Sequence, residues 1–178
     1  MTKTVLCVDL DGTLILTDTT LEATLGFIRA HPWQIWKLLW WLCKGRAYLK
    51  QQLGKHVILE PSLLPYHPSF LQWLKAQKAQ GTRLVLATAT DQRFAQAVAR
   101  YLGIFDDVFA SDGKQNLRAH KKAAVLTQRY GYQGYDYAGN SRDDLEVWKE
   151  ARHAILVNSS QQVKYMAQKK YKILEVFD

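Results

Sequence analysis

Two carboxylates stand close together near the start of the chain, in the string DLDGT that begins at Asp9. Asp9 and Asp11 come at the end of Val5–Leu10, an apolar run whose β-branched residues predict a buried strand. Gly12 follows and lets the backbone turn sharply away. A bare Asp-Gly pair is ordinarily a solvated turn, but two carboxylates at a strand end can project into one site. The string therefore favours a reactive centre.

Such a pair suits the transfer of a phosphoryl group to a side chain. An anionic nucleophile must approach an anionic phosphate, so the reaction needs a cation to offset repulsion and an acid to protonate the leaving oxygen. We expect Asp9 to attack and form an aspartyl phosphate. We expect Asp11 to act as general acid and then as general base for the hydrolytic water.

The rest of the chain alternates between short apolar runs and helical patterns. The runs predict four more strands, at Arg83–Thr88, Tyr135–Gly139, His153–Asn158 and Lys172–Phe177. Apolar residues at helical spacing predict helices over Asp91–Leu102, Ala119–Tyr130, Ser141–Arg152 and Gln161–Lys170. This alternation predicts an α/β fold: a three-layer, Rossmann-like parallel sheet with helices on both faces.

One segment interrupts the alternation. Leu14–Lys75 has helical periodicity and little strand character, which predicts a small helical cap inserted after the first strand. The predicted domains are therefore an α/β core made of residues 1–13 and 76–178, and a cap insert at residues 14–75.

Chemically useful side chains gather at one predicted edge of the sheet. In open parallel sheets ligands bind beyond the carboxyl ends of the strands, and Asp9, Thr88 and Asn140 lie at or just after such ends. DLDGT, and the motifs that follow it along the chain around Thr88, Lys122 and Asn140, resemble the four motifs of the haloacid dehalogenase superfamily of phosphohydrolases in their usual order. DLDGT looks like the first motif. Thr88, which closes RLVLAT, looks like the second, whose hydroxyl binds the phosphate.

A lysine is the third motif of that superfamily. Lys122 fits it best, because Lys122-Ala-Ala-Val-Leu reads as the face of a helix. The resemblance implies that its ammonium group holds the nucleophile and the phosphoryl oxygens. Lys121 and Lys114 are the alternatives.

The fourth motif aligns with GNSRDD, which begins at Gly139. The superfamily pattern has a carboxylate directly after the glycine, whereas this chain has Asn140. An amide oxygen can ligate Mg²⁺ but brings no charge, so metal affinity is expected to be lower. Asp144 stands at the place of the second acidic residue, with Asp143 as a substitute. The resemblance implies a Mg²⁺ site formed by Asp9, Asp11, Asn140 and Asp144.

The cap insert carries a concentration of tryptophan. The segment His31–Tyr48 reads HPWQIWKLLWWLCKGRAY and is too short and too interrupted by Lys37 to span a bilayer. Trp flanked by Lys and Arg is typical of a helix that lies among lipid headgroups. The alternative is that the rings pack inside the cap or roof the site. We therefore expect either buried cap residues or peripheral membrane contact through Trp33, Trp36, Trp40 and Trp41.

A narrower resemblance bears on the partners. The strings DLDGTL, GRAYLK, LATAT and GNSRDDLEVW resemble haloacid-dehalogenase-like domains fused ahead of UbiA-type prenyltransferases, which are integral membrane enzymes. This resemblance implies a lipid-linked or prenyl-pathway phosphate as substrate and a membrane prenyltransferase as partner. A small phosphorylated metabolite is the more general alternative for the substrate.

Composition narrows the class of protein without choosing a substrate. The 178 residues are 48% hydrophobic and 22% charged, which is typical of a globular chain. The net charge of +8 suits anionic partners, but no nucleic-acid recognition motif accompanies it, so we expect no nucleic acid. Cys7 and Cys43 match no metal or disulfide pattern, and no signal peptide is recognisable. Together these features predict a cytoplasmic protein, peripheral to the membrane if the Trp-rich segment binds lipid.

Two classes of function remain. The first is an enzyme, either a Mg²⁺-dependent phosphatase or a phosphotransferase acting on an alcohol. The second is a weakly active or inactive binding module, in which Asn140 weakens the metal site and the Trp-rich segment docks on a membrane or a membrane protein. The intact pair of Asp9 and Asp11 favours the enzyme.

Overall fold

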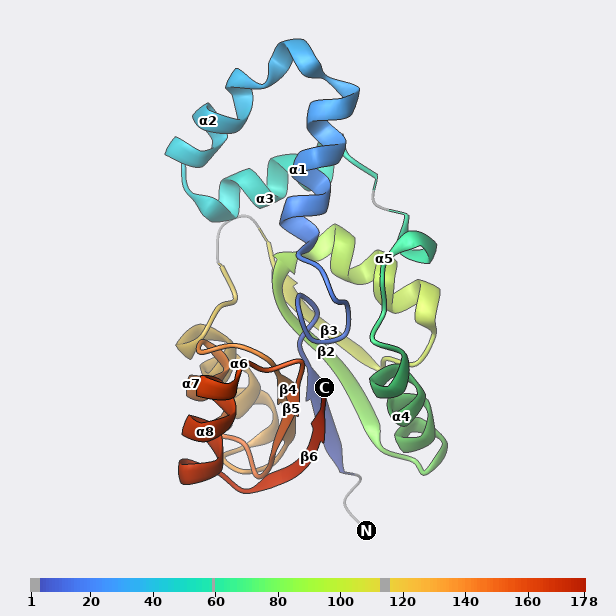
Figure 1. Ribbon diagram of the computed structural model, residues 1–178, viewed down its shortest axis with the longest axis vertical. Helices are drawn as coiled ribbons and strands as arrows, with labels where there is room; N and C mark the ends of the chain where they lie inside the picture. The colour runs from blue at the N-terminus through green and yellow to red at the C-terminus, as the bar shows by residue number, and fades with distance from the viewer. Residues whose placement is uncertain (1–3, 59, 113–115) are drawn as a thin grey trace.

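The computed structural model describes residues 4–58, 60–112 and 116–178 (Figure 1). Its strands form one sheet in the order β3-β2-β1-β4-β5-β6, and every neighbouring pair is parallel. The strands are β1 (Val5–Val8), β2 (Arg83–Asp91), β3 (Asp107–Ser111), β4 (Asp136–Gly139), β5 (Ala154–Val157) and β6 (Ile173–Phe177). Helices cover both faces, which confirms the predicted fold class.

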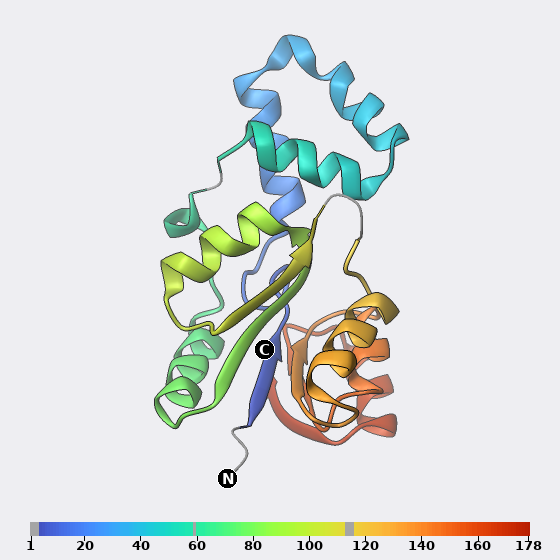
Figure 2. The ribbon, with the colours of Figure 1, turned by 180° about the vertical axis from the view of Figure 1, so that it is seen from behind.

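Alternation along the strands sorts their side chains between two layers of helix. On β2, Leu84 and Leu86 pack on one face, whereas Val85 and Ala87 pack on the other, as the two-residue period of a strand requires. Both sets are buried, because helices lie on both sides of a parallel sheet. One layer is α4 (Pro68–Ala79) and α5 (Gln92–Leu102), and the other is α6 (His120–Tyr130), α7 (Asp144–Trp148) and α8 (Gln161–Lys170) (Figures 1 and 2).

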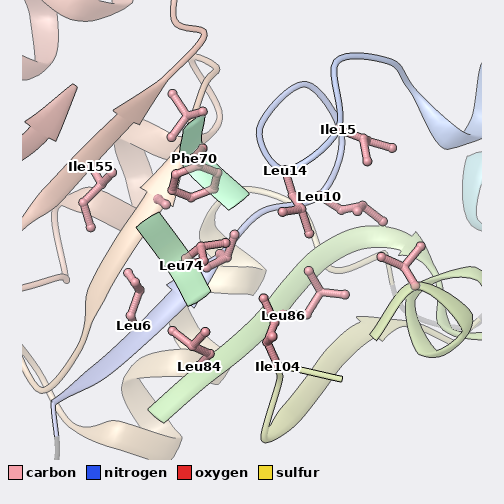
Figure 3. Close-up of a cluster of buried hydrophobic side chains, with 14 of the residues drawn as sticks. Leu6, Leu10, Leu14, Ile15, Phe70, Leu74, Leu84, Leu86, Ile104 and Ile155 are labelled. Atoms are coloured by element: carbon pink, nitrogen blue, oxygen red, sulfur yellow. The ribbon is translucent and has the colours of Figure 1, made fainter. Parts of the chain in front are cut away.

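The core extends into the predicted insert. Leu14 and Ile15, just after the DGT turn, are fully buried in the same apolar cluster as Phe70 and Leu74 of α4 (Figure 3). These residues cover the sheet, so their apolar side chains belong with the core although the sequence boundary at 14–75 assigned them to the cap. The packing thus gives the cap narrower limits than the sequence pattern did.

The cap consists of three helices that stand beyond the carboxyl ends of the strands (Figures 1 and 2). They are α1 (Thr19–Ala30), α2 (Trp36–Cys43) and α3 (Arg46–His56), and short 3₁₀ turns lie at Pro32–Gln34 and Pro61–Leu63. Asp18 caps α1 by accepting hydrogen bonds from two backbone N–H groups of its first turn. Within the described residues, no helix combines the length and the apolar composition that crossing a bilayer requires.

Two elements differ from the sequence prediction. The strand β3 was missed because it lies at the edge of the sheet, begins with Asp107 and buries only Ser111 fully. The helix predicted over Ser141–Arg152 is shortened to α7. Its first residues form a turn instead, because the backbone N–H groups of Asn140 and Ser141 both donate to the carboxylate of Asp144.

Candidate active site

Asp9 and Asp11 lie where β1 ends, on the side of the sheet that faces the cap. The backbone N–H of Asp9 donates to the carbonyl of Ala138 at 3.0 Å, so Asp9 still pairs with β4. The carboxylate of Asp11 accepts hydrogen bonds from the Thr19 backbone N–H at 2.8 Å and from the Thr90 hydroxyl at 2.5 Å. Its position therefore depends on both the cap and β2.

Lys122 is the lysine that reaches Asp9. It lies in the first turn of α6 and is 3% exposed, whereas its neighbour Lys121 is exposed to solvent. Its Nζ donates to Oδ1 of Asp9 at 2.9 Å. The fold thus brings Lys122, rather than the alternative Lys121, to the carboxylate pair. The other alternative, Lys114, lies outside the described residues.

Tyr137 on β4 joins Lys122 to Asp144. Its hydroxyl accepts a hydrogen bond from the lysine Nζ at 2.7 Å and donates to Oδ1 of Asp144 at 2.8 Å. The lysine Nζ lies 3.8 Å from that same carboxylate oxygen. Sequence reasoning missed Tyr137. The available signal was a tyrosine hydroxyl two positions before the glycine of the fourth motif, on the strand that leads into that motif.

Asp144 organises the loop that follows β4. Its Oδ2 accepts hydrogen bonds from the backbone N–H of Asn140 at 3.1 Å, and from the N–H and the hydroxyl of Ser141 at 2.9 and 2.8 Å. Because Tyr137 occupies Oδ1, both oxygens of this buried carboxylate have protein donors. The predicted substitute, Asp143, forms an ion pair with Arg118 instead.

Asn140 lies against the DGT turn. A Cβ atom added to Gly12 would lie 2.2 Å from Nδ2 of Asn140, and Gly12 has a φ of +72°. The left-handed backbone favours glycine at this position, and a larger residue would also displace the amide of Asn140. The turn and the amide therefore form one surface at the edge of the sheet.

The oxygen donors at this edge bear on metal binding. No group of three or more His, Cys, Asp or Glu in the part of the chain that the structure describes is placed to hold a metal ion. The carboxylate of Asp9 and the amide of Asn140 line the same cavity. Mg²⁺ is typically held by one or two carboxylates together with water and substrate phosphate, so these two side chains fit it. Asp11 and Asp144 lie beside them, with carboxylate oxygens engaged by protein donors.

Two threonines on β2 take different places in the site. The predicted Thr88 is fully buried, and its hydroxyl accepts a hydrogen bond from the backbone N–H of Thr90 at 3.0 Å. The hydroxyl of Thr90 contacts Asp11 and lies 2.9 Å from that of Thr19. Ala89, between the two, lines the cavity. Sequence reasoning missed Thr90, although LATAT offered two hydroxyls on the same face of the strand.

Burial controls protonation in the site. It raises the pKa of Asp9 to about 7, an effect that Lys122 opposes and Asp144 strengthens. Burial also raises the pKa of Asp11, against the hydrogen bond from Thr90. Burial alone would lower the pKa of Lys122, but the charges of Asp9 and Asp144 outweigh it and raise that pKa. A carboxyl group with a raised pKa suits proton transfer near neutral pH.

A cavity of about 800 Å³ separates these residues from the cap. Lys50 of α3 extends into it and donates to the carbonyl of Ala89 at 2.9 Å, while burial lowers its pKa. The roof of the cavity, which the cap forms, thus carries both basic and apolar side chains. Its floor, at the edge of the sheet, carries the carboxylates. Sequence reasoning did not single out Lys50 as a site residue. The roof residues from α2 and α3 are Leu42, Arg46, Leu49 and Lys50.

Comparison with known proteins gives this arrangement a family. Residues 43–149, more than half of the chain, match the family described as haloacid dehalogenase-like hydrolase. The chain belongs to this family. The carboxylate pair, the lysine and the loop after β4 lie together at the edge of the sheet where the motifs predicted them.

Solved structures share the fold over almost the whole chain. A protein of unknown function from Bordetella pertussis Tohama I superposes with a TM-score of 0.71 at 15% identity, covering 100% of this chain and 99% of that one. A substrate-bound phosphoserine phosphatase gives 0.63 at 16% identity, covering 99% and 93%. A predicted phosphoglycolate phosphatase from Haemophilus somnus gives 0.64 at 16% identity, covering 100% and 95%.

One curated relative is much longer than this chain. An uncharacterised protein of Sinorhizobium fredii, y4nM, is 36% identical over 155 residues. The match takes in 87% of this chain but only 30% of the relative. The chain therefore spans less than a third of the length of that relative.

Proposed function

We propose that this hydrolase is a Mg²⁺-dependent phosphatase that acts on a phosphate monoester through an aspartyl-phosphate intermediate. The observation that carries the proposal is the buried ion pair of Lys122 with Asp9, 2.9 Å long, beside an Asp11 held by Thr90. A phosphoserine phosphatase and a predicted phosphoglycolate phosphatase among the similar folds support a phosphate ester as the substrate class.

The residues divide the reaction between them. Asp9 attacks the phosphorus, the bond to the ester oxygen breaks, and Asp11 gives its proton to that leaving oxygen. Water then attacks the phosphorus and passes a proton to Asp11, and the bond to Asp9 breaks to release inorganic phosphate. Lys122 holds Oδ1 of Asp9 and presents its charge to the phosphoryl oxygens. We also propose that the hydroxyl of Thr88 donates a hydrogen bond to the phosphate.

The proposed metal acts on the charge of the reactants. When bound, Mg²⁺ offsets the repulsion between the attacking carboxylate and the phosphate. Asp9 and Asn140 would hold it. The carboxyl groups of Asp11 and Asp144 lie next to this position, and their negative charge favours a cation at this edge of the sheet.

The roof of the cavity supports a more specific substrate class. Arg46 and Lys50 offer positive charge, while Leu42 and Leu49 offer apolar surface, so the cavity suits a phosphate ester with an apolar substituent. We include lipid-linked and prenyl phosphates beside small phosphorylated metabolites, and a membrane prenyltransferase as the partner. The greater length of the curated relative is compatible with further domains acting beside this one.

A chromogenic phosphate ester tests the reaction. We expect turnover that requires Mg²⁺, and a loss in Asp9→Asn of at least on the order of 10³-fold. Glu175→Gln, an exposed acid on β6, is the matched control and should keep full activity. Wild-type turnover no higher than that of Asp9→Asn would overturn the proposal. A panel of prenyl phosphates and phosphorylated metabolites, ranked by kcat/KM, then tests the substrate class.

One observation favours a second candidate, a weakly active binding module: the amide of Asn140 stands where a carboxylate would add charge to the metal site. If the neutral amide lowers the affinity for Mg²⁺, Asn140→Asp should tighten Mg²⁺ binding by at least about tenfold, as measured by calorimetry. A silent wild type that gains turnover in Asn140→Asp would favour the binding module. Unchanged or weaker affinity would contradict the ligand assignment.

A further inference from the structure

The cap presents an apolar surface that the active site does not use. Trp33 is 92% exposed, Trp36 61% and Trp40 49%, and Leu39 beside them is 68% exposed. We call these four residues the tryptophan face. They lie on α2 and on the turn before it, at the part of the cap farthest from the sheet (Figure 1). Large exposed apolar side chains gathered on neighbouring turns of the chain indicate an interaction surface.

Trp41 differs from the other three clustered tryptophans, because it follows the alternative in which a ring packs inside the cap. Trp41 is 3% exposed. Its ring lies edge-on to Phe27, with centroids 5.0 Å apart, and 5.1 Å from the ring of His56. It therefore anchors α2 to α1 and α3, because its position on the helix faces them. The same contact turns the tryptophan face outward.

Two ammonium groups border this face, in a segment of the chain that is rich in basic residues. Between Glu22 and Glu60 the sequence contains no acidic residue, so most of the net charge of +8 arises in the cap. Nζ of Lys44 lies 3.8 Å from the ring centroid of Trp40, and Nζ of Lys37 lies 6.0 Å from that of Trp36. The basic residues of this segment are Arg29, Lys37, Lys44, Arg46, Lys50 and Lys55.

We propose that the tryptophan face docks the protein on an anionic lipid bilayer. Indole rings prefer the boundary between headgroups and acyl chains, and ammonium groups bordering them match the lipid phosphates. A second copy of this chain fits less well, because pairing the two faces would bring like charges together. Since α2 has 8 residues, it lies in the interface rather than across it.

Docking has a consequence for the active site. Leu42 at the end of α2 and Arg46 at the start of α3 line the catalytic cavity, next in sequence to the tryptophan face. Docking would therefore bring the cap, and with it these two residues of the cavity roof, close to a source of lipid phosphates. This consequence rests on the proposed phosphatase function, whereas docking itself requires no catalysis.

Co-sedimentation with vesicles tests the docking. We expect the protein to bind vesicles of phosphatidylglycerol and phosphatidylcholine, to bind pure phosphatidylcholine more weakly, and to be released by salt. Combining Trp33→Ala, Trp36→Ala and Trp40→Ala should lower the partition coefficient by at least about tenfold. Brominated lipids should quench the tryptophan fluorescence of the wild type. Thermal unfolding checks that the triple variant is folded, independently of any enzyme activity.

Matched controls lie outside the cap. The double variant Tyr132→Ala, Tyr165→Ala removes two rings that are 65% and 59% exposed and should bind like the wild type. Lys37→Gln with Lys44→Gln should weaken binding, whereas Lys169→Gln with Lys170→Gln on α8 should not. Equal losses in test and control variants would overturn the proposal.

Other occupants of the face give distinct results. A dimer that the triple tryptophan variant dissociates, without vesicle binding, would assign the face to a second copy of the chain. Binding only to vesicles that contain a membrane protein would assign it to a protein partner. Either result overturns docking on lipid, and neither depends on whether the chromogenic ester is hydrolysed.

Discussion

The candidate active site and the cap differ in which side chains they bury and which they expose. In the site, polar side chains are buried and each is held by another element, as Lys122 is by Asp9 and Tyr137. In the cap, large apolar side chains are exposed, and the buried cluster is small: Ala23, Phe27, Trp41, Leu53 and Phe94. The sheet thus fixes the polar groups of the candidate site, whereas the cap exposes apolar surface.

Several contacts join the two regions, among them the hydroxyls of Thr19 and Thr90, which lie 2.9 Å apart. Lys50 donates to Ala89, the Thr19 backbone N–H donates to Asp11, and Phe94 of α5 enters the cap cluster. If this division holds, changes on the sheet should affect turnover, and changes in the cap should affect binding. The following predictions probe that division in order of expected effect.

Among changes that spare Asp9, Lys122→Met should give the largest loss. It leaves Asp9 and Asp144 without their buried cation, so we expect kcat to fall by on the order of 10²- to 10³-fold. Lys121→Met, one residue earlier and exposed, should change kcat by less than about twofold. Steady-state kinetics with thermal unfolding measures both. Similar losses in the two variants would show that the ion pair is not what matters.

Protons should compete with the metal at Asp9. The pKa of Asp9 is about 7 in the fold, whereas that of an unfolded Asp is about 3.9. Between about pH 4 and pH 7 the metal-free native protein therefore keeps a proton on Asp9 that the unfolded chain has released. Mg²⁺ must displace it, and apparent affinity should fall by up to about tenfold per unit as the pH drops below about 7. The stability contributed by this protonation is present below about pH 4 and is lost as the pH rises through 7.

Calorimetric Mg²⁺ titrations at about pH 5.5, 6.5 and 7.5 measure this competition. Proton release can be read in the same experiments from buffers of different ionisation enthalpy. A pH-independent affinity would place the metal away from Asp9.

Tyr137→Phe should have an intermediate effect. It removes only the hydroxyl that joins Lys122 to Asp144, so we expect a loss of about 1–3 kcal/mol in the free energy of unfolding and about tenfold in kcat. The matched control is Tyr135→Phe, equally buried, whose hydroxyl lies 3.3 Å from Thr127. A shifted pH profile of kcat in Tyr137→Phe alone would identify a positioning role. Equal behaviour of the two variants would reduce Tyr137 to packing.

Lys50→Gln should give the smallest effect and test the cap side of the comparison. The change removes a roof cation, so we expect KM to rise by about three- to tenfold with little change in kcat. Lys55→Gln on the same helix should leave both constants unchanged. A collapse of kcat would mean that the cap takes part in the chemistry and that the division between the two regions is wrong.

Motif order and strand periodicity predicted most of the fold and part of the site. The apolar run around Cys7 and the run RLVLAT became β1 and β2, and Asp91 and Gly103 bound α5 as capping chemistry predicts. The strand β3 was not predicted, because a strand at the edge of a sheet needs few apolar residues. Sequence patterns did not predict three site residues, because their contacts depend on which groups face them across the sheet or from the cap. These residues are Tyr137, Thr90 and Lys50.

Adjacent pairs of like residues show most clearly what each level decides. The sequence by itself determined that a lysine follows the turn into α6 and that tryptophans crowd α2. Only the tertiary structure decided that Lys122 is buried while Lys121 is exposed, and that Trp41 is buried while Trp40 is exposed. Helical spacing separates such neighbours onto different faces, but which face meets the core depends on how the helix packs against elements distant in sequence.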